Sequence, residues 1–213
     1  MSQPIKLKIA LQDLPHKCER TLLIPEDVNM YQVHILIQKA MGWENAHLFE
    51  FSDKKGMATY RIGIPDDFDD DFQDVFGFTK KIQADKAKLK DIFIMENNAK
   101  PFWYLYDFGD GWEHKLSFLK VTQKDMKFYD GIPVCIKAIG KCPPEDVGGA
   151  WGYTDFLEAI SDKNHAEHTE IKEWYGLEDE NYDVNDVDIK DMNLTLKKYF
   201  NSKYWNKVDF DLY

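Results

Sequence analysis

Residues 101–121 read PFWYLYDFGDGWEHKLSFLKV, two aromatic-rich runs that flank a Gly-Asp-Gly sequence at 109–111. Aromatic residues favour strands, and a glycine-rich turn between two such runs is typical of a β-hairpin. Two registers are open, because a two-residue turn pairs Asp107 with His114, whereas a three-residue loop ending in a left-handed glycine pairs Tyr106 with His114. We therefore predict an aromatic β-hairpin here and leave its register undecided.

The N-terminal residues show the order strand, strand, helix, strand. Residues 5–11 alternate apolar and polar side chains, and residues 20–24 form a partner run after a turn sequence. Residues 26–41 carry apolar side chains at helical spacing, beginning after a proline and ending before Gly42, which suits a left-handed C-cap. A short strand is predicted at 47–51. This order is that of a β-grasp, or ubiquitin-like, unit.

The residues that follow the hairpin alternate between short elements and loops. Residues 132–138 predict a strand, and residues 141–149 must form a loop because they contain two prolines and two glycines. We expect a helix from Tyr153, a short helix within 165–175 and a last helix that begins at Asp188. The C-terminal part is therefore predicted to be mainly helical.

We predict an α+β fold, in which the β-grasp-like N-terminal unit packs with the aromatic β-hairpin and the C-terminal helices. The chain is assigned one domain over 1–213, because it contains no repeat and no low-complexity linker. Within that domain we expect a β-grasp-like half at 5–51, a hairpin and Cys-Pro-Pro-Glu-Asp half at 101–160, and a C-terminal extension at 176–213.

Charge and cysteine content narrow the function classes. Asp and Glu outnumber Lys and Arg by 38 to 27, which gives a net charge of −11. A field of this sign repels nucleic acid and anionic membranes, so neither is an expected partner. The three cysteines fit a reducing compartment, and no apolar run reaches the length of a membrane span. We therefore predict a cytoplasmic protein.

Two polar clusters could hold a metal ion, although each has a plainer explanation. Residues 66–74 read DDFDDDFQD, which is typical of a solvated acidic loop and lacks the glycine and glutamate positions of a calcium-binding EF-hand. His165 and His168 lie three apart on a predicted helix, a spacing also common on polar helix faces. No metal or cofactor is predicted from either cluster.

The hairpin holds the most notable group of polar side chains: Asp107, Asp110, Glu113 and His114. Carboxylates beside an imidazole can perform general acid–base chemistry or bind a metal. The same residues can also stabilise a turn or form hydrogen bonds within a strand pair. Because buried charges need partners, we expect these acids to face water or to meet donors. The expected donors are His114 itself, Lys141, and the backbone N–H groups of Gly148 and Gly149.

Several motifs stand out along the chain: His34, Gly42-Trp43, HLFEF at 47–51, YLYDFGDGWEH at 104–114, CPPEDVGG at 142–149, and Gly152-Tyr153 with Phe156-Leu157. Together they resemble the plasmid pRiA4b ORF-3-like family. This resemblance implies a compact α+β fold and an association of some members with mobile elements, but it assigns no chemistry. It groups Asp107, Asp110, His114, Cys142, Glu145 and Asp146 as one neighbourhood.

We predict a non-enzymatic binding or interaction protein, whose partner could be another protein, because no catalytic signature occurs. The alternative is a metal-assisted hydrolase or nuclease that uses the carboxylates and His114, and a third hypothesis is a nucleic-acid accessory protein. Any functional site should lie where the hairpin tip meets the loop ending in Gly148 and Gly149, whose N–H groups are expected donors. A pocket open to solvent is expected beside His114.

Overall fold

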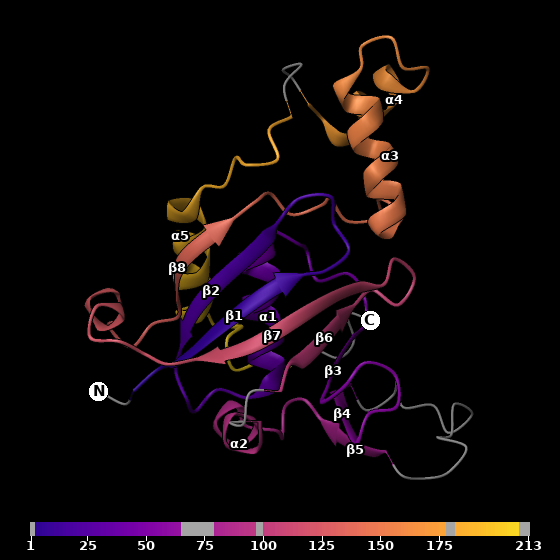
Figure 1. Cartoon of the computed structure of the whole chain (residues 1–213). Helices are drawn as coiled ribbons and strands as arrows, with labels where there is room; N and C mark the ends of the chain where they lie inside the picture. The colour runs from indigo at the N-terminus through magenta and orange to yellow at the C-terminus, as the bar shows by residue number, and fades with distance from the viewer. Residues whose placement is uncertain (1–2, 65–78, 97–99, 178–181, 209–213) are drawn as a thin grey trace.

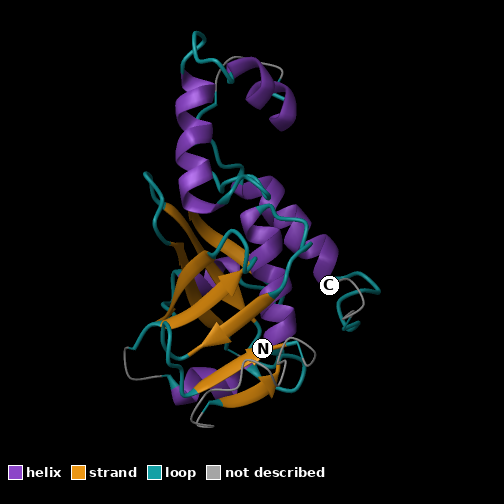
Figure 2. Cartoon of the chain, turned by 90° about the vertical axis from the view of Figure 1, so that its right-hand side faces the viewer, coloured by secondary structure: helices purple, strands orange, loops and turns teal. Residues whose placement is uncertain are grey.

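The computed structural model describes residues 3–64, 79–96, 100–177 and 182–208. An eight-stranded sheet forms its centre, α1 lies across one face of that sheet, and α3 and α4 project beyond one end (Figures 1 and 2). The predicted α+β class is therefore confirmed.

The strands are β1 (Ile5–Leu11), β2 (Cys18–Ile24), β3 (Phe49–Ser52), β4 (Tyr60–Gly63), β5 (Lys80–Gln83), β6 (Phe102–Tyr106), β7 (Trp112–Leu119) and β8 (Val134–Ile139). The helices are α1 (Met30–Met41), α2 (Leu89–Met95), α3 (Gly149–Ser161), α4 (His168–Tyr175), α5 (Ile189–Phe200) and the 3-10 helix η3 (Asp125–Phe128).

The strand order is β5-β4-β3-β6-β7-β1-β2-β8. Neighbouring strands are antiparallel except β4 and β5, which run parallel. The hairpin β6–β7 stands between β1 and β3, so the N-terminal strands are joined through strands of the second half. The two halves predicted from the sequence therefore share one sheet.

Alternation along β1 explains how the sheet presents a core face. Leu7 and Ile9 are buried, whereas Lys6 and Lys8 on the opposite face are only partly covered. Successive strand side chains point to opposite faces, so this pattern places the apolar set toward α1. Leu36 of α1 is fully buried in the same hydrophobic cluster. Helix α5 packs against α1 and β8, which closes the core on that side.

Helix α1 begins later than the sequence pattern predicted. Asn29, rather than the Pro25 to Asp27 segment, is the N-cap: its side chain accepts a hydrogen bond from the Gln32 N–H (2.8 Å), and the Gln32 side chain accepts one from the Asn29 N–H (2.9 Å). This reciprocal capping box satisfies two N–H groups that the helix end leaves unpaired. The predicted end is correct, since Gly42 has a φ of 92°.

The hairpin adopts neither of the two predicted registers. Tyr104 faces His114 and Tyr106 faces Trp112, which leaves residues 107–111 as a five-residue loop. Asp107 takes a left-handed φ of 55°, and its carbonyl accepts a hydrogen bond from the Gly111 N–H at 2.7 Å. The longer loop arises because Asp107 leaves the strand instead of extending it.

Other boundaries are shifted by a few residues. Helix α3 starts at Gly149, four residues before the predicted Tyr153. The predicted start of α5 is correct, since Asp188 is its N-cap and accepts hydrogen bonds from the Lys190 and Asp191 N–H groups. The acidic stretch 66–74 lies outside the described residues. Among the described residues, no helix combines the length and apolar character needed to cross a bilayer.

Candidate cation-binding site

The hairpin tip and the 142–149 loop meet, as the sequence pattern predicted. The Gly148 N–H donates a hydrogen bond to Asp110 Oδ2 at 3.2 Å. Gly149 approaches even more closely, because a Cβ built on it would lie 2.4 Å from the Asp110 carbonyl oxygen. A side chain at this position would collide with the hairpin, so glycine permits the contact.

Three potential metal ligands converge beside this contact. His47 Nε2 lies 3.0 Å from Asp146 Oδ1 and 3.7 Å from Asp107 Oδ2. One ligand atom from each of the three residues falls within 4.8 Å of the other two. In the described part of the chain, no other set of three His, Cys, Asp or Glu residues satisfies this spacing. The three residues come from separate segments: the loop before β3, the end of β6 and the loop before α3.

Backbone contacts hold the Asp107 carboxylate in place. Its Oδ1 accepts hydrogen bonds from the Gly109 N–H (2.9 Å) and the Asp110 N–H (3.3 Å). The Asp107 N–H donates to the Leu48 carbonyl at 2.9 Å, which ties the hairpin to the segment that carries His47. One carboxylate oxygen is thereby occupied by the turn, and the other is directed toward His47.

Glu145 anchors the loop instead of pointing into the cluster. Its Oε2 accepts from the Glu44 N–H at 2.7 Å, and its Oε1 accepts from the Tyr106 hydroxyl. Burial and this carboxylate both raise the pKa of Tyr106, so the phenol keeps its proton and remains the donor. The loop is therefore fastened to β6 immediately beside Asp107.

His114 belongs to the core: among the described residues its side chain borders no solvent-open space, contrary to the predicted pocket. The side chain is fully buried, with ring centroids 5.4 Å from Trp43 and 5.0 Å from Tyr104. Its Nδ1 lies 3.0 Å from the Trp112 carbonyl. Burial lowers the pKa of His114 to about 3, so the imidazole is neutral at physiological pH. The observed register places it opposite Tyr104, on the inward face.

Glu113 and Cys142 also lie apart from the cluster. Glu113 is next to His114 on β7, so it points to the opposite face, where it pairs with Lys55. Cys142 is near Cys18, and burial raises the pKa of its thiol well above the ordinary value. A thiol with a raised pKa is a poor nucleophile, which agrees with a packing role.

The two helical histidines do not form a metal site. His168 is buried, and its Nδ1 lies 2.9 Å from the Ala159 carbonyl. His165 precedes α4 and accepts a hydrogen bond from the Glu167 N–H. Neither belongs to the three-ligand group found among the described residues.

A groove with a volume of about 800 Å³ borders the cluster. It runs between the C-terminal end of α1, the 141–146 loop and the beginning of α5, and Glu145 and Asp146 contribute to its edge.

Of the three potential metal ligands, the sequence pattern predicted Asp107 and Asp146 as site residues but not His47. The available signal was the HLFEF motif, in which His47 is the only residue that can ligate a transition metal strongly.

Comparison with known proteins gives three consistent matches. A sequence model described as "Plasmid pRiA4b ORF-3-like protein" matches residues 3–191. The "Uncharacterized protein y4hQ" of Sinorhizobium fredii (strain NBRC 101917 / NGR234) is 35% identical over 189 residues, which cover 89% of this chain and 88% of the relative. The crystal structure of MM3350, a protein of unknown function from Methanosarcina mazei Go1, has a TM-score of 0.69 and 31% identity, and the match covers 89% of this chain and 97% of that chain.

Proposed function

We propose that this chain, which belongs to the plasmid pRiA4b ORF-3-like family, is a binding protein that holds a divalent transition-metal ion at His47, Asp107 and Asp146. One observation supports the proposal most directly. His47 Nε2 is buried and has no hydrogen-bond partner among the described residues, although it lies between two carboxylates. An imidazole nitrogen with two carboxylate oxygens is a common ligand set for zinc, manganese and iron.

The spacing of the donor atoms fits an ion placed among them. With metal–ligand bonds of about 2.05 Å, neighbouring donors lie about 2.9 Å apart in an octahedral site and about 3.3 Å apart in a tetrahedral one. The separation of 3.0 Å between His47 Nε2 and Asp146 Oδ1 matches these values, the 3.7 Å to Asp107 Oδ2 is a few tenths of an ångström longer, and all three donors lie within 4.8 Å of one another. Small side-chain rotations would therefore complete the site without a change in the backbone.

Three protein ligands leave coordination positions for water or an external group. The bordering groove offers space for such a ligand beside Asp146. This arrangement also favours a second candidate function, metal-assisted hydrolysis, in a form that no longer involves the buried His114. Binding remains the first proposal because Glu145, an additional carboxylate on the same loop as Asp146, is occupied by the Tyr106 hydroxyl and the Glu44 N–H.

Calorimetric titration of the metal-free protein with Zn²⁺ and Mn²⁺ tests the binding proposal. We expect one saturable site, and His47→Ala and Asp146→Asn should each weaken it by at least tenfold, as loss of a ligand removes one metal–protein bond. Asp155→Asn, which changes an exposed carboxylate on α3, is the matched control. Equal affinities for wild type, His47→Ala and Asp146→Asn would refute the site.

Hydrolysis needs a separate test. The Mn²⁺-loaded protein should cleave an activated phosphodiester faster than metal-free protein, and His47→Ala should remove the difference. Metal binding without any such rate increase would leave the binding function standing and eliminate the hydrolase candidate.

We further propose that residues 1–213 form one domain with β-grasp-like character in its N-terminal half, supported by the shared sheet and by the β1–β2 hairpin that leads into α1. A cytoplasmic location is supported by the three free cysteines. An association with mobile elements is proposed from the family description alone. A protein partner is proposed because the sequence carries no catalytic signature. The net charge of −11 argues against binding of duplex DNA, and a mobility-shift assay at physiological salt tests this.

A further inference from the structure

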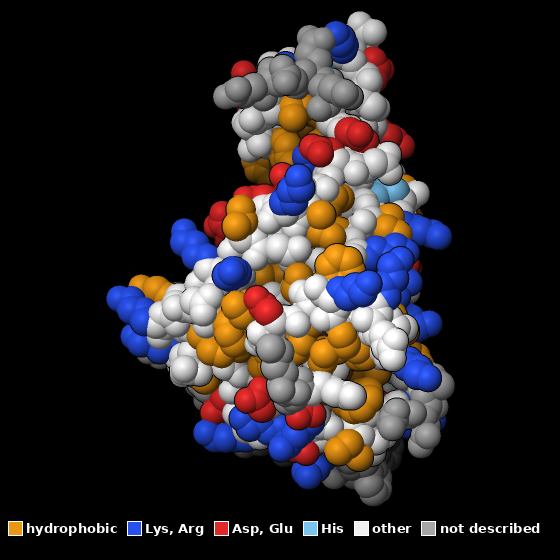
Figure 3. Space-filling view, turned by 90° about the vertical axis from the view of Figure 1, so that its left-hand side faces the viewer, with side chains coloured by type: hydrophobic (Ala, Val, Ile, Leu, Met, Phe, Trp, Pro, Cys, Tyr) orange, Lys and Arg blue, Asp and Glu red, His pale blue; other side chains and the backbone are white. Residues whose placement is uncertain are grey.

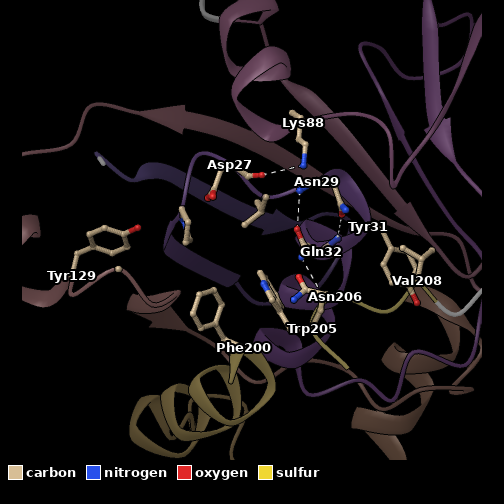
Figure 4. A pocket seen from close by; sticks show the side chains of 13 residues that line it. Asp27, Asn29, Tyr31, Gln32, Lys88, Tyr129, Phe200, Trp205, Asn206 and Val208 are labelled. Carbon is tan, nitrogen blue, oxygen red and sulfur yellow. Dashed lines mark hydrogen bonds between the residues drawn. The ribbon is translucent and has the colours of Figure 1, made fainter. Parts of the chain in front are cut away.

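A second pocket lies at the opposite end of α1 from the candidate metal site. The side of the molecule that carries α5 gathers hydrophobic side chains over its centre, with Lys, Arg, Asp and Glu around them (Figure 3). At the end of α5, a pocket of about 510 Å³ is enclosed by the N-terminal end of α1, the residues after η3 and the turn that follows Phe200 (Figure 4). Its volume falls within the range of small-molecule sites. Helix α1, whose 12 residues span about 18 Å, runs from this pocket to the groove that borders the metal site.

Aromatic rings from separate segments form the walls. Tyr129 is almost fully buried, and Phe200 and Trp205 pack against each other with ring centroids 4.8 Å apart and planes inclined by 55°. Two rings set at such an angle form a corner, and Tyr129 lies on the other side of the space (Figure 4). The Tyr129 hydroxyl points toward this space (Figure 4), and an aromatic ring that borders it can stabilise a cation through its quadrupole.

Most of the polar side chains in the lining are already engaged. Asn29 and Gln32 cap α1, and Gln32 Nε2 also donates to the Trp205 carbonyl at 3.1 Å. Lys88 Nζ donates to the Asp27 carbonyl at 3.3 Å. By contrast, the Asp27 carboxylate and the Tyr129 hydroxyl have no hydrogen-bond partner within the described ranges. Two oxygen acceptors are therefore available to a ligand.

Negative charge dominates the surroundings of Tyr129. Burial raises the pKa of Tyr129, and the carboxylates of Asp27, Asp130 and Glu26 raise it further. Lys88 is the one basic residue in the lining, and its ammonium faces the carbonyl of Asp27. The lining itself holds one carboxylate, that of Asp27, and one ammonium, that of Lys88, and the carboxylates of Asp130 and Glu26 near Tyr129 shift the balance toward a cation.

We propose that this pocket binds an organic cation with an alkylammonium group, held by the Asp27 carboxylate and by the aromatic rings of Tyr129, Phe200 and Trp205. Oxygen-rich cages suit metal ions, whereas aromatic walls with a single carboxylate in the lining suit a bulky, weakly hydrated ammonium. The site is independent of the metal cluster, so either proposal can fail without the other.

Titration of the full chain with choline tests the proposal, and 3,3-dimethylbutan-1-ol, its uncharged isostere, is the matched ligand. We expect saturable choline binding at millimolar concentration or below, and binding of the alcohol weaker by about tenfold or more, because only choline can gain from the carboxylate and the ring quadrupoles. Equal binding of the two ligands, or no saturable choline binding, would overturn the proposal.

Substitutions of residues that line the pocket test whether choline binds there. Asp27→Asn should weaken choline binding by about tenfold while the alcohol is unaffected, and Phe200→Leu should weaken it by a smaller factor. Asp155→Asn on α3 is the control and should bind choline like the wild type. If Phe200→Leu does not fold, Asp27→Asn still decides the question, since Asp27 is exposed and its side chain makes no described hydrogen bond. Unchanged choline affinity in Asp27→Asn would refute the pocket.

Discussion

His114 and His47 are both part of family-like motifs, yet their surroundings are opposite. His114 is fully buried between Trp43 and Tyr104, whereas the His47 side chain is 29% exposed and faces two carboxylates. His114 lies within strand β7, and His47 lies in the loop before β3. The same side chain is thus a packing residue in one place and a potential ligand in the other.

The difference follows from where each residue stands in the sheet. Along β7, Trp112, His114 and Leu116 are buried and point toward the core, because strand residues alternate between faces. The three residues of the metal cluster all lie outside strands and helices. Loops held by a rigid scaffold can bring side chains from distant segments together, so this is where chemistry is expected.

The largest expected effect is on acid stability, and it comes from the buried histidines His34 and His114. Burial lowers the pKa of both His34 and His114 from 6.5 to about 3. Between these pH values the unfolded chain binds protons that the folded chain does not, so the free energy of unfolding falls as pH decreases. From pH 6.5 to about 5, each histidine should cost about 2 kcal/mol. Denaturant unfolding measured across this range tests the expectation.

The variant His114→Phe should remove about half of that loss, since it deletes one of the two neutral imidazoles. Leu116→Ala, on the same face of β7, is the matched control: it should lower the free energy of unfolding at every pH and leave the pH dependence unchanged. An identical pH dependence in wild type and His114→Phe would contradict the buried, neutral state of His114.

The second prediction concerns the contact that assembles the loop cluster. Gly149 has a φ of 68°, and an added Cβ would lie 2.4 Å from the Asp110 carbonyl oxygen. Gly149→Ala should therefore lower the free energy of unfolding by about 1–3 kcal/mol, and it should weaken metal binding because the loop must move away from the hairpin. Thermal unfolding and metal titration measure the two effects.

Gly111 provides the matched control for this substitution. Its φ is 69°, but nothing lies within 4 Å of an added Cβ. Gly111→Ala should show only the cost of the left-handed backbone, about 1 kcal/mol, and it should keep metal affinity. If the two variants behaved alike, the close approach of Gly149 to Asp110 would have no energetic role.

The sequence was sufficient to predict those structural features that depend on residues close together in the chain. The apolar alternation of β1, the C-cap at Gly42 and the N-cap at Asp188 can be read from residue types and spacing. It also predicted that the hairpin tip meets the 142–149 loop, because both segments are rich in Gly and acidic residues. These features are set by interactions between residues close together in the chain or by the family-like motifs.

Hairpin register and the identity of the third ligand could not be predicted. The five-residue loop depends on Asp107 adopting a left-handed conformation, which its side chain supports through bonds to the Gly109 and Asp110 N–H groups. No pattern along the strands requires that conformation. His47 reaches the cluster only because β3 pairs with β6, and this pairing joins segments more than 50 residues apart. Long-range pairing of this kind is invisible to local periodicity.

The smallest effect is expected at Glu113, which sequence analysis had grouped with the site. Glu113 lies beside His114 on β7 but on the opposite face, where its carboxylate pairs with Lys55. Both side chains are more than a third exposed, and exposed ion pairs contribute between about 0 and 1 kcal/mol. Glu113→Gln should therefore change the free energy of unfolding by less than about 0.5 kcal/mol and leave metal affinity unaltered, in contrast to Asp146→Asn. Parallel metal titrations of the two variants provide the measurement. A loss of affinity in Glu113→Gln comparable to that of Asp146→Asn would place Glu113 at the cluster, and the separation of strand faces from the loop site would then be wrong.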